Sequence, residues 1–389
     1  MAITYGFIGL GHLGRHLAGS LVRDGFDVTV HDLDPGNAKD LLANGARWAD
    51  DPQAVAQAVD AVITCLPSPR VSERVLTGER GILAGLKPGG TWIEMSTLDE
   101  QEVLRLGKIA ADRGVRMLEA PVTGGVHLAA SGEITVITGG DADLHALHLP
   151  AFEAMGNRIF RAGPLGKASV IKVITNMLAF IHLIATGEAL MLAKKGGIDL
   201  TDAFNIIKAS SGNSFVHETE GQVILNGSYN INFTMDLAVK DLGFALGFGR
   251  EFGVPLDLAS HALQTFIRAR STYGGDAWSS QVVKLLEDAT GTDLRTGLSS
   301  GTLSEESERR HLRRSVFPAK KPKDISRLLP WHHIRPSLPM ISPAHSMGCT
   351  RICASSVRTR WPAAIPARIR QIWPPASWRS LLRRLRRRH

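Results

Sequence analysis

In this sequence of 389 residues, Lys172 and Asn176 are the polar residues whose spacing most directly indicates a catalytic or binding site. They stand four residues apart in the stretch Gly163–Asn176, where a glycine turn leads into a long, almost uncharged segment that ends near Lys195. On an α-helix, side chains four residues apart project from one face, so the amine and the amide would lie together. Two interpretations are open. Either the lysine stem packs on apolar surface while its charge reaches solvent, or the amine is desolvated until it exchanges protons near neutral pH.

The segment that carries these two residues has the pattern of one long helix. Apart from Lys172, its only ionisable side chains in residues 170–193 are His182 and Glu188, so protein or lipid has to cover most of it. A membrane span needs about 20 predominantly apolar residues, and polar residues interrupt this segment repeatedly. We therefore predict a buried helix between two domains over residues 164–195, and we expect no membrane partner.

A second set of candidate residues lies near the N-terminus, in the run Gly9-Leu10-Gly11-His12-Leu13-Gly14. An apolar strand, Thr4–Ile8, precedes this run and an amphipathic segment suited to a helix follows it. Strand, glycine turn and helix form the context of a dinucleotide-binding fingerprint, in which the glycines allow a tight turn, close approach of the pyrophosphate and helix packing. The phosphates would lie at the helix N-terminus, so we predict that these six residues bind a cofactor.

Asp32 follows the next strand, Asp27–His31, and stands 18 residues after Gly14. An acidic residue about 20 residues beyond the fingerprint accepts hydrogen bonds from the ribose hydroxyls and repels a 2′-phosphate. With Asp34 adding a second negative charge, the sequence favours NAD over NADP as the cofactor. The alternative is that Asp32 is a helix N-cap or turn residue before Pro35.

Further strands at residues 61–65 and 91–94 alternate with helix-like stretches, which is typical of a doubly wound parallel sheet. Ligands of such sheets bind beyond the carboxyl ends of the strands. Leu66 and Pro67 would therefore wall the cofactor, and Thr97 would reach its nicotinamide side. Each of these three residues fits an ordinary turn equally well.

Thr123, Gly124 and Gly125 follow another strand, at residues 116–118. Adjacent glycines expose backbone N–H groups that can hold a carboxylate, and the threonine hydroxyl is a further donor. A plain glycine turn is the alternative. Residues 197–295 show helix-length patterns and almost no strand alternation, which predicts an all-helical domain.

The charge of the chain divides it into two unlike parts. Residues 1–295 contain 25 Lys and Arg against 33 Asp and Glu, whereas residues 296–389 contain 20 basic residues and four acidic ones. The tail also holds 10 of the 19 prolines and 4 of the 7 tryptophans, and no helical or strand period continues into it. It is either a basic extension that binds nucleic acid or an anionic surface, or a disordered or frameshift-derived segment. We favour the second reading, because acidic residues and periodicity are lost together, and so we expect no nucleic-acid partner.

Composition limits the location and the metal chemistry. The sequence starts at Met1 and enters a strand without a basic, apolar and small-residue signal pattern, so we expect a cytoplasmic protein. Three cysteines, Cys65, Cys349 and Cys353, are too few for a disulfide framework. The last two lack companion ligands, and we predict no metal site.

The order of these motifs resembles the β-hydroxyacid dehydrogenases, the family that includes 3-hydroxyisobutyrate dehydrogenase, tartronate semialdehyde reductase and, more distantly, 6-phosphogluconate dehydrogenase. Four blocks carry the resemblance over residues 3–295: Gly9–Gly14, Glu119–Gly125, Gly163–Asn176 and Lys240-Asp241-Leu242 after Asn232-Phe233-Thr234. It implies a Rossmann-type NAD-binding domain at 1–163, the interdomain helix at 164–195, and an all-α substrate and oligomerisation domain at 196–295. The tail at 296–389 has no counterpart in the family.

The resemblance also implies roles for individual residues. Lys172 would be the general acid/base, Asn176 would help to hold the substrate, and Lys240 would lie against cofactor and substrate. Thr123, Gly124 and Gly125 would bind the substrate carboxylate.

We therefore expect an NAD-dependent dehydrogenase of a small β-hydroxyacid, assembled as a homodimer or homotetramer. The substrate candidates are 3-hydroxyisobutyrate, glycerate with tartronate semialdehyde, and serine. The alternative is a non-catalytic nucleic-acid-binding or interaction protein on a dehydrogenase scaffold, which the retention of Lys172 and Asp32 argues against.

Overall fold

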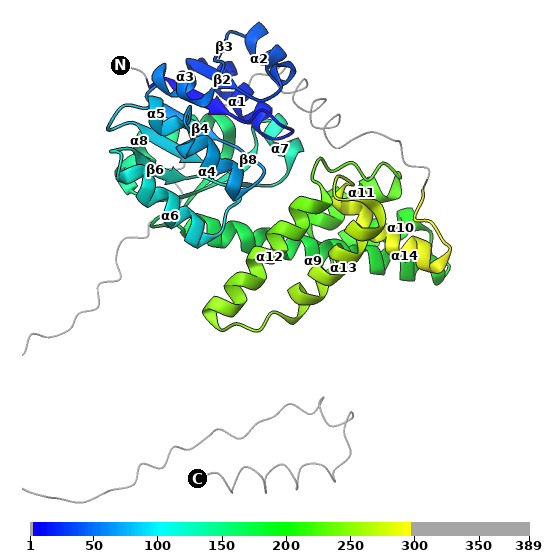
Figure 1. The fold of residues 1–389 in the computed structure, drawn as a ribbon. Coiled ribbons are helices and arrows are strands. Elements are labelled where there is room, and N and C mark those ends of the chain that lie inside the picture. The colour runs from blue at the N-terminus through cyan, green and yellow to red at the C-terminus, as the bar shows by residue number, and fades with distance from the viewer. Residues whose placement is uncertain (1–2, 297–389) are drawn as a thin grey trace, which may run out of the picture. The chain divides into compact units, whose positions relative to one another are not determined.

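The computed structural model describes residues 3–296. The predictions made for the basic tail lie outside the described residues, apart from Thr296. Within residues 3–296 the chain forms a sheet domain and a helical domain, drawn in blue to cyan and in green to yellow in Figure 1.

The first domain is built on a nine-stranded sheet with helices between its parallel strands, and the alternating pattern predicts this kind of sheet. The strand order is β3-β2-β1-β4-β5-β6-β8-β7, and β9 pairs with β8. From β3 to β6 in this order, every pair of neighbouring strands runs parallel. The strands are β1 Tyr5–Ile8, β2 Val28–His31, β3 Arg47–Trp48, β4 Ala61–Thr64, β5 Thr91–Glu94, β6 Arg116–Glu119, β7 Val122–Thr123, β8 Ile134–Gly139 and β9 Gly156–Gly163.

The sheet is parallel in its greater part, as predicted, but not at one edge. β8 runs antiparallel to both β6 and β7, and only β9 restores a parallel pair. The segment between β6 and β8 holds only the short helix α7, Val126–Ala130, and the chain reverses at Gly124 and Gly125, whose φ angles are 122° and 88°. A parallel return normally needs a full crossover helix, so the reversal produces an antiparallel neighbour instead.

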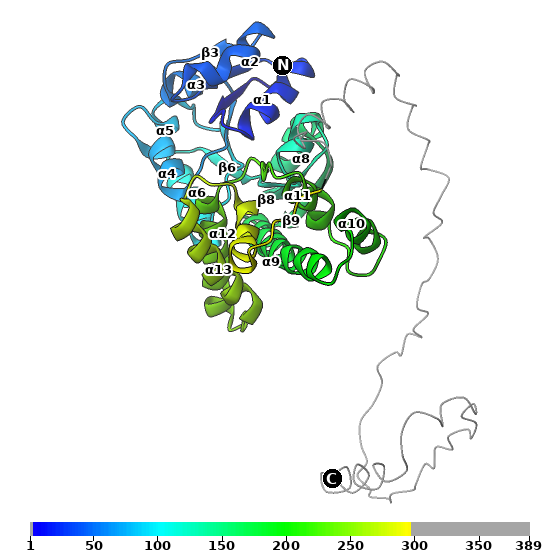
Figure 2. The ribbon, with the colours of Figure 1, turned by 90° about the vertical axis from the view of Figure 1, so that its right-hand side faces the viewer.

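Helices cover both faces of this sheet, as Figure 2 shows. On one face α1 and α8 pack around a core that includes Phe7, Leu17 and Phe152. On the other face α3, α5 and α6 enclose Trp92 and its apolar neighbours. The bounds are α1 Gly14–Arg23, η1 Pro35–Ala38, α2 Lys39–Ala43, α3 Pro52–Gln57, α4 Pro69–Thr77, α5 Ile82–Gly85, α6 Glu100–Ala111 and α8 Ala142–Met155.

The second domain is helical, as predicted, and is organised around the long helix α9, Lys167–Lys195. Its core includes Phe180, Leu183 and Phe266, contributed by α9 and by α13, which packs on it. Among the described residues α9 is the one helix long and apolar enough to cross a membrane, and it packs here against α11, α12, α13 and the sheet edge. The other helices are α10 Leu200–Lys208, α11 Phe215–Leu225, α12 Met235–Phe252, α13 Asp257–Tyr273, η2 Ser279–Val283 and α14 Lys284–Thr290.

A carboxylate from the sheet caps the start of α9. The N-cap residue Gly166, at φ 93°, offers no side chain for this purpose. Instead the buried carboxylate of Glu119, at the end of β6, accepts hydrogen bonds from the backbone N–H groups of Ala168 and Ser169 at 3.0 and 2.9 Å. The Ser169 hydroxyl donates a third bond at 2.7 Å. Since the first N–H groups of a helix have no partner within it, Glu119 fixes where α9 begins.

We expect Glu119→Leu to lower the free energy of unfolding by about 3 kcal/mol, because it leaves buried N–H donors without an acceptor. Ser169→Ala removes only one bond and should cost about 1 kcal/mol. Urea titration measures both. Glu153→Gln, an exposed carboxylate on α8, is the control and should change stability little. Equal stabilities for Glu119→Leu and this control would contradict the capping role.

Candidate active site

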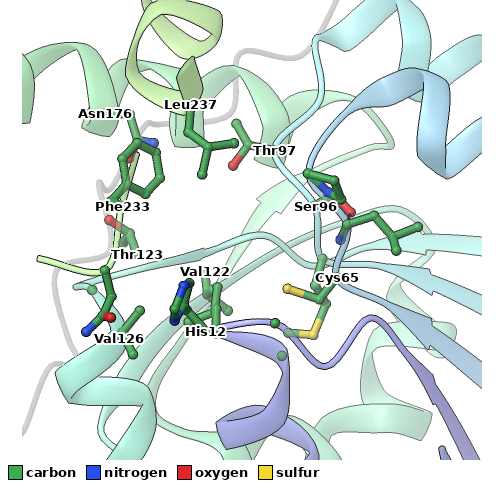
Figure 3. A pocket seen from close by; sticks show the side chains of 18 of the residues that line it. His12, Cys65, Ser96, Thr97, Val122, Thr123, Val126, Asn176, Phe233 and Leu237 are labelled. Carbon is green, nitrogen blue, oxygen red and sulfur yellow. Dashed lines mark hydrogen bonds between the residues drawn. The ribbon is translucent and has the colours of Figure 1, made fainter. Parts of the chain in front are cut away.

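A cleft of about 1520 Å³ runs between the carboxyl ends of the parallel strands and the helical domain. Figure 3 shows side chains from several elements around it: His12 from the glycine loop, Cys65 and Ser96 from the strand ends, and Phe233 and Leu237 from the helical domain. Residues separated widely in the sequence thus share one cavity.

Lys172 and Asn176 lie together in the wall of this cleft, as their spacing predicts. The Lys172 Nζ atom donates to the Oδ1 atom of Asn176 at 2.8 Å. Lys172 is 8% exposed, so its stem and amine are enclosed by the protein. This burial of the Lys172 amine argues against the interpretation in which the lysine charge extends into solvent.

Asn176 connects the lysine to a hydrogen-bonded relay. Its Nδ2 atom donates to the Oδ2 atom of Asp241 at 2.6 Å. The other oxygen of Asp241 pairs with Lys240 Nζ at 2.6 Å, and the same ammonium donates to the backbone carbonyl of Thr97 at 3.0 Å. The relay therefore runs from α9 through α12 to the loop after β5.

The environment of Lys172 makes it a weaker base than an exposed lysine. Burial lowers its pKa to about 8, the negative charge of Asp241 opposes that change, and the positive charge of Lys240 adds to it. A buried amine with a pKa close to the ambient pH can both accept and donate a proton.

The glycine loop has the shape that a dinucleotide requires. Gly9 adopts φ 97°, and a Cβ atom on Gly14 would come within 1.9 Å of the Gly9 carbonyl oxygen. A Cβ atom on Gly11 would meet nothing within 4 Å, so this backbone borders open cleft. Helix α1 begins without a side-chain cap, which leaves N–H groups free for phosphate oxygens. The donor set fits the pyrophosphate of NAD.

Asp32 lines the same cleft and also holds the loop. Its Oδ2 atom accepts a hydrogen bond from the Leu10 N–H at 2.6 Å, and its Oδ1 atom accepts from the N–H of Asp34 at 2.9 Å. The N-cap of the 3₁₀ helix that starts at Pro35 is Asp34. Asp32 therefore does stabilise the turn before Pro35, but the N-cap residue of the following helix is Asp34.

The remaining predicted cofactor residues surround the cleft. His12, Leu13, Leu66, Pro67, Thr97 and Lys240 line it, together with Gly9, Gly11 and Gly14. Leu10 does not: its side chain is fully buried, and only its N–H takes part through Asp32. The Leu66 N–H is fixed by the Ser96 hydroxyl at 2.7 Å, so the loops after β4 and β5 are tied together.

The predicted carboxylate-binding segment lies across the cleft from the strand ends. Thr123, Gly124 and Gly125 all line it, and the Thr123 hydroxyl lies 3.5 Å from the hydroxyl of Thr175 on α9. The positive φ angles of both glycines turn the backbone where the chain leaves β7. This arrangement brings Thr123 next to the helix face that carries Lys172 and Asn176.

Comparison with known proteins identifies the two domains. Residues 4–163 match the NAD binding domain of 6-phosphogluconate dehydrogenase, and residues 166–286 match the NAD-binding domain of NADP-dependent 3-hydroxyisobutyrate dehydrogenase. The 2-(hydroxymethyl)glutarate dehydrogenase of Eubacterium barkeri is 33% identical over 76% of this chain and 99% of its own length. This chain belongs to the β-hydroxyacid dehydrogenase family. It is therefore an oxidoreductase that binds NAD.

Two further members of this family are similar over the same part of the chain. The L-threonate dehydrogenase of Cupriavidus necator is 34% identical over 73% of this chain and 96% of its own length. The crystal structure of 3-hydroxyisobutyrate dehydrogenase from Salmonella typhimurium is 31% identical, covers 73% of this chain and 99% of its own, and superposes with a TM-score of 0.69. Family membership supports the dehydrogenase over the non-catalytic interaction protein.

Several site residues of this β-hydroxyacid dehydrogenase were not predicted as such. Asp241 stands in the sequence only as part of a motif, and Thr175 carries no sequence pattern of its own. Two ring contacts also join the domains across the cleft: His12 meets Trp278 edge-on at 5.7 Å, and His127 stacks on Phe215 at 6.1 Å. In residues 3–296 no group of three or more His, Cys, Asp or Glu side chains is arranged to hold a metal ion.

We expect Gly11→Ala and Gly14→Ala to separate cofactor binding from folding. The Gly11 variant should keep its stability within about 1 kcal/mol, because the new methyl enters open space, yet bind NADH about 10-fold or more weakly. The Gly14 variant should unfold at lower temperature, because its methyl overlaps the Gly9 carbonyl. Thermal unfolding and NADH fluorescence titration measure the two effects. Unchanged NADH affinity in the Gly11 variant would contradict the assigned role of the loop.

Proposed function

We propose that this enzyme transfers hydride between a small β-hydroxyacid and NAD, with Lys172 as the general acid/base. The observation that carries the proposal is the enclosed amine of Lys172, bonded to Asn176 at 2.8 Å in the cleft that also contains the glycine loop. The candidate substrates are 3-hydroxyisobutyrate, glycerate with tartronate semialdehyde, and serine.

Lys172 moves the proton in this scheme. When the hydroxyacid is oxidised, the neutral amine accepts the hydroxyl proton, and when the carbonyl is reduced, the ammonium returns it. NAD, when bound, supplies the nicotinamide ring that accepts or returns the hydride. The pKa of about 8 allows Lys172 to serve both directions.

The substrate carboxylate would be held opposite Lys172. Thr123 offers its hydroxyl, and Gly124 and Gly125 offer backbone N–H groups in a turn that borders the cleft. The Asn176 side-chain oxygen accepts a hydrogen bond from Lys172, and one of its amide hydrogens is donated to Asp241. An amide group has two hydrogens, so one remains for the substrate.

Asp32 supports a preference for NAD over NADP. Its carboxylate lines the cleft after β2 and stays close to the loop through the bond from Leu10. A 2′-phosphate placed there would meet negative charge from Asp32 and Asp34. Initial rates with the two cofactors in parallel measure the preference.

We further propose a cytoplasmic homodimer or homotetramer that does not act on nucleic acid or membranes. Exposed apolar side chains on the helical domain support self-association, since Leu192 is 76% exposed and Ile206 is 64% exposed. Sedimentation equilibrium of the purified chain measures the assembly.

Lys172→Ala should abolish turnover while NAD binding survives, because the amine takes part in proton transfer and the glycine loop is untouched. We expect kcat to fall by about 10²-fold or more. NADH appearance against the panel of β-hydroxyacids and calorimetric titration with NAD give the two readouts. Loss of NAD binding in a folded variant, or near-normal turnover, would contradict the assignment.

The rate of oxidation should rise with pH through a midpoint near 8, because only the neutral amine of Lys172 accepts the proton. Asp241→Asn should move that midpoint to lower pH, since the negative charge of Asp241 raises the pKa of Lys172. Glu251→Gln, on the exposed end of α12, is the matched control and should leave the midpoint in place. The profile of kcat/KM against pH is the measurement, and an unshifted midpoint in Asp241→Asn would contradict the coupling.

A further inference from the structure

Trp278 of the helical domain contacts the glycine loop of the sheet domain. Its indole ring meets the imidazole ring of His12 edge-on, with 5.7 Å between the ring centroids and 75° between the ring planes. His12 belongs to the loop Gly9–Gly14 and lines the cleft (Figure 3). Trp278 lies between α13 and η2. The contact therefore joins the two domains at the loop that fits the diphosphate of NAD.

The backbone around Trp278 is fixed to the start of α12. Trp278 forms an antiparallel bridge with Thr234, the N-cap residue of that helix. The Ser279 N–H donates to the Phe233 carbonyl at 2.8 Å, and the Met235 N–H donates to the carbonyl of the residue before Trp278 at 2.7 Å. The indole ring is thus held in place by the fold of the helical domain.

The space between the glycine loop and this segment is part of the cleft. On the loop side, a Cβ atom on Gly11 would meet nothing within 4 Å, and no side chain caps the first N–H groups of α1. On the other side, Thr234 and Ser279 line the same cleft. A diphosphate bound by the glycine loop would therefore lie next to the segment that carries Trp278.

The contact between His12 and Trp278 is one of two uncharged rings. Partial burial and the positive charge of Arg15 lower the pKa of His12, so its ring is neutral at pH 7 and above. Aromatic rings favour this edge-on arrangement, but a single pair contributes little energy. Such a contact can form and break each time a cofactor enters and leaves.

We propose that His12 and Trp278 form a latch that closes the helical domain over the diphosphate of bound NAD and slows its release. The latch would exclude water from one side of the diphosphate, which strengthens its hydrogen bonds to the glycine loop. Since Trp278 is fixed to the start of α12, the latch closes together with the bond from Lys240, on the same helix, to the Thr97 carbonyl. The proposal does not depend on which hydroxyacid is oxidised.

Release of NADH from the full chain tests the latch, and stopped-flow fluorescence after displacement by excess NAD measures it. Trp278→Ala should raise the dissociation rate constant by about 3- to 10-fold and leave the association rate constant within about two-fold. Trp278→Phe keeps a ring in this place and should retain most of the slow release. An unchanged dissociation rate constant in Trp278→Ala would overturn the proposal.

The matched control removes a ring contact that lies within one domain. His145 stacks on Phe152 at 6.2 Å, and both residues belong to α8. His145→Ala should leave NADH release unchanged. A fraction of unfolded protein in any variant lowers the amplitude of the release signal without altering its rate constant, so the measurement separates the latch from a loss of folding.

A double variant tests whether the two rings act as one unit. His12→Ala removes the same contact, so adding Trp278→Ala to it should increase the dissociation rate constant no further. Multiplied effects of the two substitutions would mean that Trp278 acts independently of His12, which contradicts a latch formed by the pair.

Fragments of the cofactor locate the effect. ADP-ribose carries both phosphates without the nicotinamide, and adenosine carries no phosphate. In competition titrations against NADH, Trp278→Ala should weaken ADP-ribose by about 3- to 10-fold and leave adenosine unchanged. Equal weakening of both fragments would assign Trp278 to the shape of the whole cleft and overturn its role at the diphosphate.

None of these measurements requires turnover, so the latch and the proposed function fail separately. If no hydroxyacid is oxidised but Trp278→Ala releases NADH faster, the proposed function fails and the latch stands. If hydroxyacids are oxidised and NADH release does not respond to Trp278→Ala, the latch is overturned and the proposed function stands.

Discussion

The hydrogen bonds between the Glu119 carboxylate and the start of α9 are the constraint on which the site depends. They join the end of β6 to the N-terminus of the helix that carries Lys172. Glu119 also packs closely against β8, because a Cβ atom on Gly139 would overlap a Glu119 oxygen. Lys172 follows Ala168 by four residues, a little more than one helical turn. Its position relative to the sheet is therefore set by an anchor only one turn away.

The pKa of Lys172 results from opposing effects, of which burial is the largest. Burial alone would drive the amine toward neutrality, and the negative charge of Asp241 restores part of the preference for the ammonium form. Because Asn176 separates the two groups, Asp241 acts on Lys172 without taking its proton. The same carboxylate neutralises Lys240, so the cleft contains two amines near each other at a moderate electrostatic cost.

The parts of this site that the sequence predicts are those with a local signature. The glycine loop, the strand ends and the pair Lys172 and Asn176 all follow from short spacings that backbone geometry alone explains. The Glu119 cap and the Asp241 relay could not be predicted in this way, because their partners are 49 and 65 residues away in the sequence. The antiparallel direction of β8 could not be predicted from the strand pattern, because it depends on a chain reversal at glycines of positive φ.

The bond from Lys240 to Thr97 is the one bond of the relay that joins the helical domain to the sheet domain. Lys172, Asn176, Asp241 and Lys240 all belong to α9 and α12, whereas the bond from Lys240 to the Thr97 carbonyl reaches the loop after β5. A rotation that parted the two domains would break this bond and leave the remaining members of the relay in register. Lys240 would then interact more strongly with Asp241. The negative charge of Asp241 would in turn raise the pKa of Lys172 by less. The pKa of Lys172 would therefore differ between a closed and an opened arrangement of the two domains.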